Sequence, residues 1–189
     1  MKNLVIAISG ASGAIYAKQA LEFLHQLDSV KTHLIISHSA HITIKQELDI
    51  AAKELEALAD VTYPVKDISA CLASGSFKID GMLILPCSVK TMSNIATGNG
   101  DNLITRTADV MLKERKKLLL AVREAPLHAI HLENMQKLAA LGVYIFPPVP
   151  AFYNKPKSLE ELIADSVARM ISYFDIELDS FKRWQGIKS

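Results

Sequence analysis

The chain has 189 residues, half of them hydrophobic, and its 21 Lys and Arg residues against 20 Asp and Glu residues give a formal net charge of +1. A chain of this length removes roughly 70% of its unfolded surface from water, so we expect one domain over residues 1–189. The balanced charge, without a long basic block, speaks against a nucleic-acid-binding protein.

Three further classes of protein do not fit the sequence: disulfide scaffolds, membrane-spanning proteins and secreted proteins. The two cysteines, Cys71 and Cys87, are too few for a disulfide scaffold and lack metal-ligand spacing, which predicts a reducing, cytoplasmic setting. Nowhere do about 18 apolar residues follow one another without interruption, so no membrane span is expected. The apolar run 4–8 is only as long as a strand and is soon interrupted by Gly10 and Gly13, so it does not predict a secretory signal.

Short apolar runs alternate along the chain with longer segments of helical period, a pattern typical of βαβ units. The predicted fold class is therefore α/β, with a parallel sheet and helices on both of its faces. Strands are predicted at residues 4–8, 32–37, 61–65, 82–85, 118–122 and 143–146. Helices are predicted at residues 15–27, 102–117, 131–141 and 158–174, the last beginning with a capping box from Ser158 to Glu161.

The segment 9–13 (SGASG) follows the first predicted strand and opens the first predicted helix. Glycines permit a tight turn, and a helix N-terminus offers free N–H groups and a partial positive charge, which suit a phosphate. Plain turn geometry explains the same residues, so both interpretations stay open at this point. Ser37 stands where a ribose-binding carboxylate would follow in a dinucleotide site, which favours a mononucleotide.

Further polar residues follow other predicted strands. In an open parallel sheet, ligands bind outside the carboxyl ends of the strands, and hydroxyl and guanidinium donors gathered there suit a phosphate ester. The residues that map to this edge are Ser12, Ser37, Ser88, Thr91 and Arg123. Cys87 borders the same edge; its apolar neighbours predict a small buried side chain, and its place at the edge leaves a cofactor contact open as the alternative.

Cationic side chains recur on two later helices. Arg106 and Lys113 are seven residues apart and share one helical face, whereas Arg169 flanks the apolar stripe of the last helix, which predicts partial burial and a partner. Between these helices, the segment 146–156 contains four prolines, which predicts irregular structure. This segment, which carries Tyr153, is either a lid over a pocket or a packed surface loop.

Seven motifs in order resemble the UbiX flavin prenyltransferases, formerly named phenylacrylic or polyprenyl-hydroxybenzoate carboxy-lyases. They are GASGA at 10–14, ASGS at 73–76, PCSVKT at 86–91, ADVMLKER at 108–115, REAPL at 123–127, HLENM at 131–135 and PAFY at 150–153. The resemblance extends to Trp184 and implies a Rossmann-like or flavodoxin-like subunit. It also implies a transferase that joins the dimethylallyl group of dimethylallyl monophosphate to N5 and C6 of reduced FMN, making prenylated FMN for a partner decarboxylase.

The same resemblance implies an assembly and a set of site residues. The assembly is a homododecamer with its sites at subunit interfaces. FMN would be held by Gly10, Ala11, Ser12, Ser37, Ser88, Val89, Lys90, Thr91 and Arg123. The dimethylallyl phosphate would be bound by Arg106, Lys113, Tyr153 and Arg169, and catalytic roles would fall on Ser12, Glu47, Lys113, Glu124 and Trp184.

The residue types of this set suit a reaction without a metal ion. An allylic phosphate leaves by C–O cleavage, which cations stabilise at the phosphate and aromatic faces stabilise at the allyl cation. The arginines, Lys113 and the Tyr153 hydroxyl can stabilise the charge on the phosphate. Trp184 and the flavin ring can stabilise the allyl cation. The sequence contains no DDxxD-type carboxylate cluster that would hold Mg²⁺.

Two other functions remain open. The first keeps the fold and FMN but assigns decarboxylation, as in the flavin-containing cysteine decarboxylases, which carry a PxMNxxMW-type segment where this chain has PCSVKT at 86–91. The second is a non-catalytic flavin-binding subunit that supports a partner enzyme. A binding subunit would not need the cations, Tyr153 and Glu124 together, which favours the transferase.

Overall fold

The computed structural model describes residues 1–178 and Gly186. Six parallel strands form one sheet in the order β3-β2-β1-β4-β5-β6. The strands are β1 (Lys2–Ile8), β2 (Val30–Ile36), β3 (Val61–Pro64), β4 (Gly81–Cys87), β5 (Lys117–Val122) and β6 (Tyr144–Ile145). This is the strand order of the Rossmann arrangement, so the predicted α/β class and Rossmann-like fold are confirmed.

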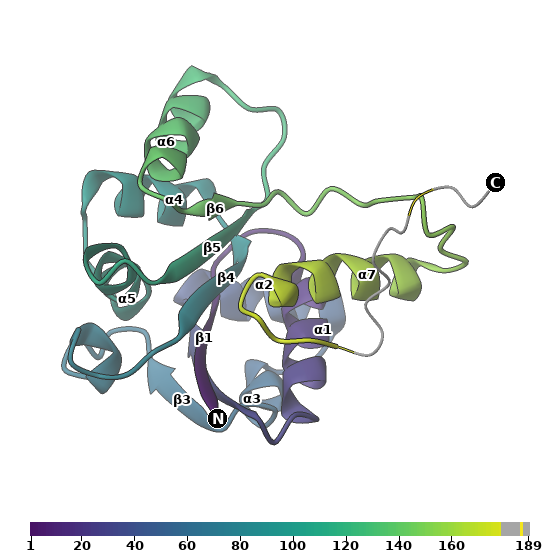
Figure 1. Ribbon diagram of the computed structural model, residues 1–189, viewed down its shortest axis with the longest axis horizontal. Coiled ribbons are helices and arrows are strands. Elements are labelled where there is room, and N and C mark those ends of the chain that lie inside the picture. The colour runs from purple at the N-terminus through teal and green to yellow at the C-terminus, as the bar shows by residue number, and fades with distance from the viewer. Residues whose placement is uncertain (179–185, 187–189) are drawn as a thin grey trace.

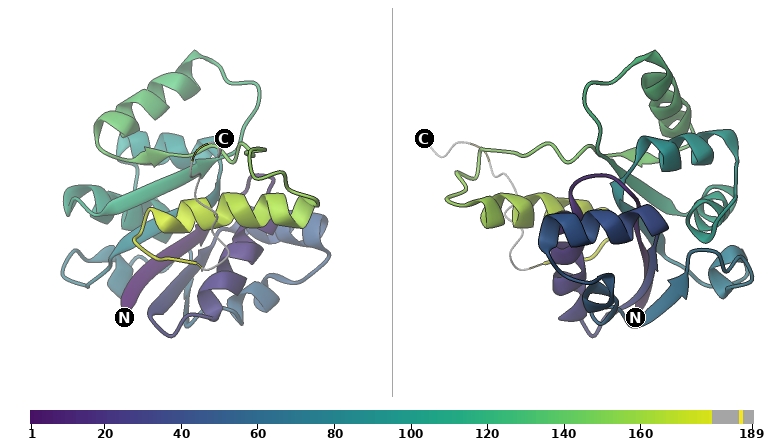
Figure 2. Two further views of the ribbon diagram at one scale, coloured as in Figure 1. Left: turned by 45° about the vertical axis from the view of Figure 1, so that its right-hand side comes forward. Right: turned by 180° about the vertical axis from the view of Figure 1, so that it is seen from behind.

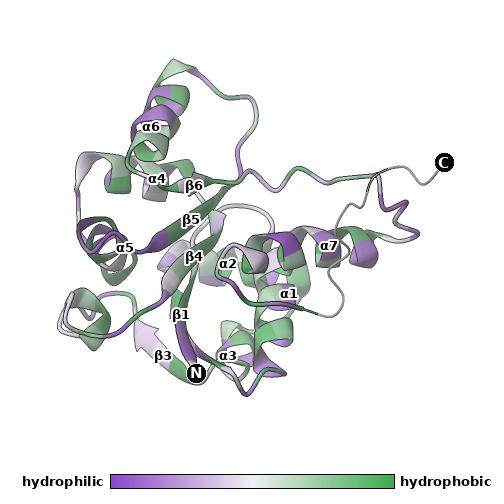
Figure 3. Cartoon of the chain, in the orientation of Figure 1, coloured by the Kyte–Doolittle hydropathy of each residue, from purple (hydrophilic) through white to green (hydrophobic). Residues whose placement is uncertain are grey.

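Helices cover both faces of the sheet (Figure 1, Figure 2). One face packs against α1 (Ala14–His25), α2 (His38–Leu48), α3 (Ala52–Glu56) and α7 (Leu159–Ser172). The other packs against η1 (Cys71–Ala73), α4 (Val89–Thr97), α5 (Leu103–Lys113) and α6 (Ala129–Ala140). Because successive strand residues point to opposite faces, Leu4 and Ile6 belong to the first core and Val5 and Ala7 to the second. Figure 3 shows the hydrophobic residues that follow from this double burial along the middle of the sheet.

The order in which the chain adds strands to the sheet reverses between β1 and β4, which are parallel neighbours in its centre. Crossovers from β1 lead to β2 and β3 on one side, and those from β4 lead to β5 and β6 on the other. The connections that leave the carboxyl ends of β1 and β4 therefore diverge and leave a crevice between them. This crevice is where the fold places a ligand.

The predicted helices differ from the structure in two ways. The helix predicted at 102–117 ends at Lys113, because Arg115 has a left-handed φ of 52° and Lys117 already begins β5. The helices α2 and α3 were not predicted, and neither was α4. Its N-cap is Ser88 and its left-handed C-cap is Gly98, but the residues between are rich in β-branched and hydroxyl side chains, which have low helix propensity.

The proline-rich segment leaves the body of the molecule (Figure 1). Residues 146–158, all of them described, form neither helix nor strand, as the four prolines predict. This arm ends at Ser158, whose side chain accepts a hydrogen bond from Glu161 N and so begins α7. The Glu161 carboxylate accepts from Lys157 N rather than from Ser158 N, one residue earlier than the predicted capping box requires.

Candidate functional site

A cavity of about 350 Å³ opens at the crevice between β1 and β4. Segments that follow four strands contribute to it: the turn after β1, the first turn of α2, the first turn of α4 and the residues after β5. Its lining residues are Gly10, Ala11, Ser12, Ser39, Ser88, Val89, Lys90, Arg123 and Glu124. Residues that the sequence analysis assigned from separate motifs thus meet around one space.

Ser39 belongs to this cavity but was not among the predicted residues. A Cβ atom added to Gly10 would overlap the Ser39 side chain, with Ser39 Oγ only 2.6 Å away. Glycine at position 10 therefore lets the turn after β1 approach the first turn of α2. The position of Ser39 two residues after the helix-capping Ser37 is the one signal of this contact that the sequence contains.

Two helix N-termini point at the cavity and are each capped by a serine. Ser37 Oγ accepts from Ala40 N at 3.1 Å at the start of α2, and Ser88 Oγ accepts from Thr91 N at 3.2 Å at the start of α4. Ser88 Oγ also donates to Thr91 Oγ1 at 3.1 Å. Ser37 and Thr91 are absent from the cavity lining and organise the helix starts instead. The remaining first-turn N–H groups and the partial positive charge of both helices favour an anion here.

The N-terminus of α1 is occupied by a side chain of the protein itself. Glu47 Oε2, on α2, accepts hydrogen bonds from Gly13 N at 2.9 Å and Ala14 N at 2.8 Å. Gly13, the N-cap residue of α1, has a φ of 110°, a conformation that glycine adopts without strain. A ligand phosphate at this edge would therefore meet α2 and α4 rather than these two amides, and Glu47 links α2 to the glycine-rich turn.

The cavity carries both signs of charge. Lys90 and Arg123 supply two cations and Glu124 one carboxylate, and all three are exposed. The backbone N–H of Arg123 donates to Cys87 O at 3.0 Å, which fixes the residue beside the end of β4. Cys87 is itself fully buried, as predicted, and burial raises the pKa of its thiol, so this side chain packs in the core as a neutral group.

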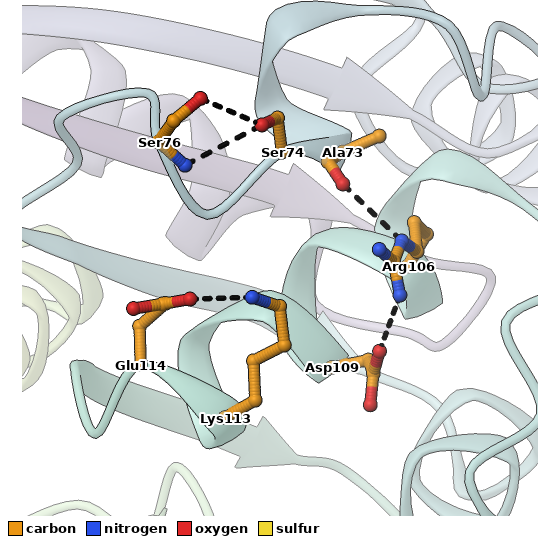
Figure 4. Close-up of polar contacts among 7 residues, drawn as sticks. All are labelled: Ala73, Ser74, Ser76, Arg106, Asp109, Lys113 and Glu114. Carbon is orange, nitrogen blue, oxygen red and sulfur yellow. Dashed lines mark hydrogen bonds and ion pairs between the residues drawn. The ribbon is translucent and has the colours of Figure 1, made fainter.

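A second group of predicted residues lies on α5, against the loop 73–76 (Figure 4). Arg106 Nε donates to Ala73 O at 3.2 Å, and its Nη1 pairs with Asp109 Oδ2 at 2.6 Å. Lys113 pairs with Glu114, and this contact lowers the pKa of the Glu114 carboxyl. The guanidinium is thus held at two points, which fixes the plane of its remaining donors.

A third group lies where the arm meets α7. Tyr153 and Arg169 line a small cavity of about 50 Å³, together with Phe146, Val149, Ala151, Asn154, Asp165 and Ser166. The Arg169 guanidinium carbon lies 5.0 Å from the centre of the Tyr173 ring, a cation–π distance. The predicted partner of Arg169 is therefore present, but the residue is exposed rather than partly buried.

These groups do not form one site within one chain. Helix α5 packs on one face of the sheet and α7 on the other, so Arg106 and Lys113 lie across the sheet from Tyr153 and Arg169 (Figure 1). Trp184, to which a catalytic role was assigned, lies outside the described residues. One subunit thus presents a central cavity and, on opposite faces of its sheet, two separate groups of the residues predicted to bind the prenyl phosphate.

Within residues 1–178 and Gly186, no three His, Cys, Asp or Glu side chains come together as metal ligands. In the same residues, no helix combines the length and apolar character that a membrane crossing requires.

Comparison with known proteins shows the family to which the chain belongs. The model of the Flavoprotein family matches residues 1–178. The flavin prenyltransferase UbiX of Escherichia coli K12 is 50% identical over 188 residues, covering 98% of this chain and all of that protein. The chain belongs to the UbiX-type flavin prenyltransferase family.

Two solved structures of this family superpose on nearly the whole chain. AnUbiX (PadA1), solved in complex with FMN and dimethylallyl pyrophosphate, is 48% identical, covers 99% of both chains and has a TM-score of 0.96. The dodecameric FMN-dependent UbiX-like decarboxylase from Escherichia coli O157:H7 is 43% identical, covers 97% of this chain and all of that chain, and has a TM-score of 0.95. The resemblance stated from the seven motifs is thereby confirmed.

Proposed function

We propose that this protein is a flavin prenyltransferase, which joins the dimethylallyl group of dimethylallyl monophosphate to N5 and C6 of reduced FMN. One observation carries the proposal: the cavity at the β1/β4 crevice is built from the motifs shared with the family, on a chain that superposes on a relative solved with FMN and a dimethylallyl donor. The function is therefore proposed from the site as well as from the family.

The cavity suits a flavin mononucleotide. Two helix N-termini, Lys90 and Arg123 suit the phosphate, and the absence of a side chain at Gly10 keeps the turn close to Ser39. The remaining lining residues with predicted FMN roles are Ala11, Ser12, Ser88 and Val89, while Ser37 and Thr91 act through the helix caps. When bound, reduced FMN supplies the nucleophilic N5 and the adjacent C6 of the ring.

The cationic residues act on the prenyl phosphate. The C–O bond of the ester breaks and the phosphate keeps the electron pair, so fixed cations lower the barrier. Arg106 and Lys113 of one copy and Tyr153 and Arg169 of another would bind this phosphate. The first pair is already partnered by Asp109 and Glu114, which leaves little excess positive charge and favours a monophosphate over the more highly charged diphosphate.

The second bond would join flavin C6 to the tertiary carbon of the prenyl double bond, so a proton must be added to the neighbouring alkene carbon and a proton must leave C6. Glu124, a carboxylate on the cavity wall, would accept the proton from C6 and return it to the alkene carbon, and Ser12 lies on the same wall. Glu47 would act beside them from the start of α1, where it holds two backbone amides. Trp184 completes the proposal as an aromatic neighbour of the allyl group.

Two copies are needed because each chain holds the phosphate-binding residues on opposite faces of its sheet. The arm supports such an assembly, since its apolar residues Val149 and Phe152 are 73% and 67% exposed. A related structure is named as a dodecamer, and we propose the same state here, with sites at the subunit interfaces. Cys71 and Cys87 are both free, which supports the reducing, cytoplasmic setting.

Two alternatives share the fold. A related structure is named as a decarboxylase, but residues 86–91, at the end of β4 and the start of α4, read PCSVKT rather than the PxMNxxMW type of the cysteine decarboxylases. A non-catalytic flavin-binding subunit would not need Arg106, Lys113, Tyr153, Arg169 and Glu124 together.

The product of this enzyme would pass to a decarboxylase that requires prenylated FMN, which we propose as its functional partner.

The test is anaerobic incubation of the purified protein with reduced FMN and dimethylallyl monophosphate, followed by mass spectrometry of the flavin. We expect a flavin heavier by one C5H8 unit, slower product formation with the diphosphate, and no product without a donor. Bound FMN of unchanged mass would favour the binding-subunit alternative. Transfer of the product to a decarboxylase lacking its flavin, with recovery of decarboxylation, tests the partner.

A further inference from the structure

Ser9 is a buried polar residue at the end of β1 that has no assigned role. It is only 1% exposed and directly follows the last strand residue, Ile8. Its hydroxyl donates to Pro86 O at 3.0 Å and accepts from Ser88 N at 2.8 Å. One side chain at the end of β1 thus binds the backbone on both sides of Cys87.

The hydroxyl replaces a part of the strand ladder that the sequence cannot form. Regular pairing of β1 with β4 ends at Ala7 and Ile84. Pro86, two residues further on, has no N–H group to donate to a neighbouring strand. The Ser9 backbone N–H donates to Pro86 O at 3.2 Å. The Ser9 hydroxyl adds the bond to Ser88 N, which connects the two segments that diverge after β1 and β4.

The segments that follow Ser9 and Cys87 form opposite parts of the cavity lining. Gly10 to Ser12 follow Ser9 directly, and Ser88 to Lys90 begin α4. Ser88 is the N-cap of α4, so the position of its N–H group also sets the direction of the first turn of that helix. The Ser9 hydroxyl therefore fixes how far the glycine-rich turn stands from the start of α4.

We propose that Ser9 is a positioning residue for FMN: its hydroxyl sets the separation of the turn 10–12 and the N-terminus of α4 at which the flavin mononucleotide binds. The inference rests on the flavin site of the proposed function. Ser9 contacts neither substrate in this scheme and acts through Ser88 and Pro86. Without the hydroxyl, the N–H of Ser88 loses its partner and the two sides of the crevice are free to separate.

A matched control exists at the opposite end of the sheet. Thr32, near the start of β2, is also 1% exposed, and its hydroxyl donates to Asp60 Oδ2 at 2.8 Å and accepts from Asp60 N at 3.0 Å. Thr32→Val removes an equally buried, doubly bonded hydroxyl and keeps the shape of the side chain. It tests whether the loss of any such hydroxyl would affect the cavity.

The experiment compares the wild-type protein, Ser9→Ala and Thr32→Val by FMN titration and by thermal unfolding without flavin. We expect both variants to unfold at lower temperature, but only Ser9→Ala to raise the Kd for FMN, by about tenfold. At saturating FMN, the turnover of Ser9→Ala should stay within about twofold of wild type, because the reacting groups are intact. Ser9→Cys, which keeps the bulk and a weak hydrogen-bonding group, should bind FMN with intermediate affinity.

Either of two results would overturn this inference and leave the proposed function intact. The first is wild-type FMN affinity in both Ser9→Ala and Ser9→Cys. The second is a loss of FMN affinity in Thr32→Val equal to that in Ser9→Ala. If Ser9→Ala does not fold, the comparison of Ser9→Cys with Thr32→Val decides by the same criteria. A wild-type protein that binds no FMN would overturn the proposed function, and this inference with it.

Discussion

Glu47 accepts hydrogen bonds from the backbone of Gly13 at 2.9 Å and of the following residue at 2.8 Å, so a carboxylate from α2 caps the N-terminus of α1. In many nucleotide-binding folds this position receives the ligand phosphate. Here the protein supplies its own anion, and the glycine-rich turn is tied to the second helix. Glu47 therefore has a structural role that is separable from the proposed catalytic one.

Substitution of Glu47 separates these roles. Glu47→Gln keeps one acceptor oxygen for the amides, whereas Glu47→Ala removes the cap and should lower the free energy of unfolding by about 1 kcal/mol. If the carboxylate also takes part in catalysis, Glu47→Gln should lose turnover while unfolding near the wild-type temperature. Thermal unfolding and single-turnover kinetics of both variants measure this. Equal destabilisation by Gln and Ala would rule out the capping role.

Arg106 is held at two points, by Ala73 O and by Asp109, and a lysine cannot reproduce both contacts. Arg106→Lys keeps the charge but loses the fixed plane of donors. We expect it to raise the KM for the prenyl phosphate by about tenfold and to leave the Kd for FMN unchanged. Arg115→Lys, two residues beyond the end of α5, is the control and should change neither constant. An unchanged KM in Arg106→Lys would show that charge alone is sufficient.

His33 gives the protein a pH-dependent stability. It is 2% exposed on β2, with Nδ1 2.9 Å from Tyr63 Oη and Nε2 3.3 Å from Asn3 Oδ1. Burial, together with the charge of Lys31, lowers the pKa of its imidazole, while Asp60 acts in the opposite direction. The unfolded chain, with a His pKa of about 6.5, then binds a proton more readily than the native chain.

Native stability is therefore retained above pH about 6.5 and falls as the pH decreases from there toward the lowered native pKa. Thermal unfolding at pH 7.5 and pH 5.5 measures the difference. His33→Gln should reduce it, whereas His41→Gln, at an exposed position on α2, should leave it as in the wild type. The same pH dependence in His33→Gln would exclude His33 as its source.

Much of the fold follows from the sequence because the strands are doubly buried. Residues 4–8 and 118–122 must be apolar on both faces of the sheet, so each forms a continuous apolar run that identifies a buried strand in the sequence. The third predicted strand, 61–65, contains Pro64, and β3 is an edge strand, where a proline is tolerated. Helix α4 escaped prediction because its capping residues, rather than its propensities, define it.

The residues of the candidate site could be predicted only where a polar residue follows an apolar strand directly, because such a residue must lie at the carboxyl edge of the sheet. Serines and arginines after apolar runs mark the edge of the sheet, and they meet in the cavity. Spacing along α5 places Arg106 and Lys113 on one helical face but cannot tell which face of the sheet that helix covers. Ser9 and Ser39 take their positions from the close approach of chain segments that are distant in sequence, and the one local signal of it is the position of Ser39 two residues after Ser37.

The central claim is that one prenyl-transfer site takes its phosphate-binding residues from two copies of the chain. Arg106→Ala and Arg169→Ala should each abolish prenyl transfer while keeping FMN bound. When the two variants are co-expressed in equal amounts, about a quarter of shared sites receive an intact residue from each copy. The measurement is the yield of prenylated flavin, by mass, from the purified mixed oligomer. We predict about a quarter of the wild-type yield, and a mixture no more active than the separate variants would contradict the account.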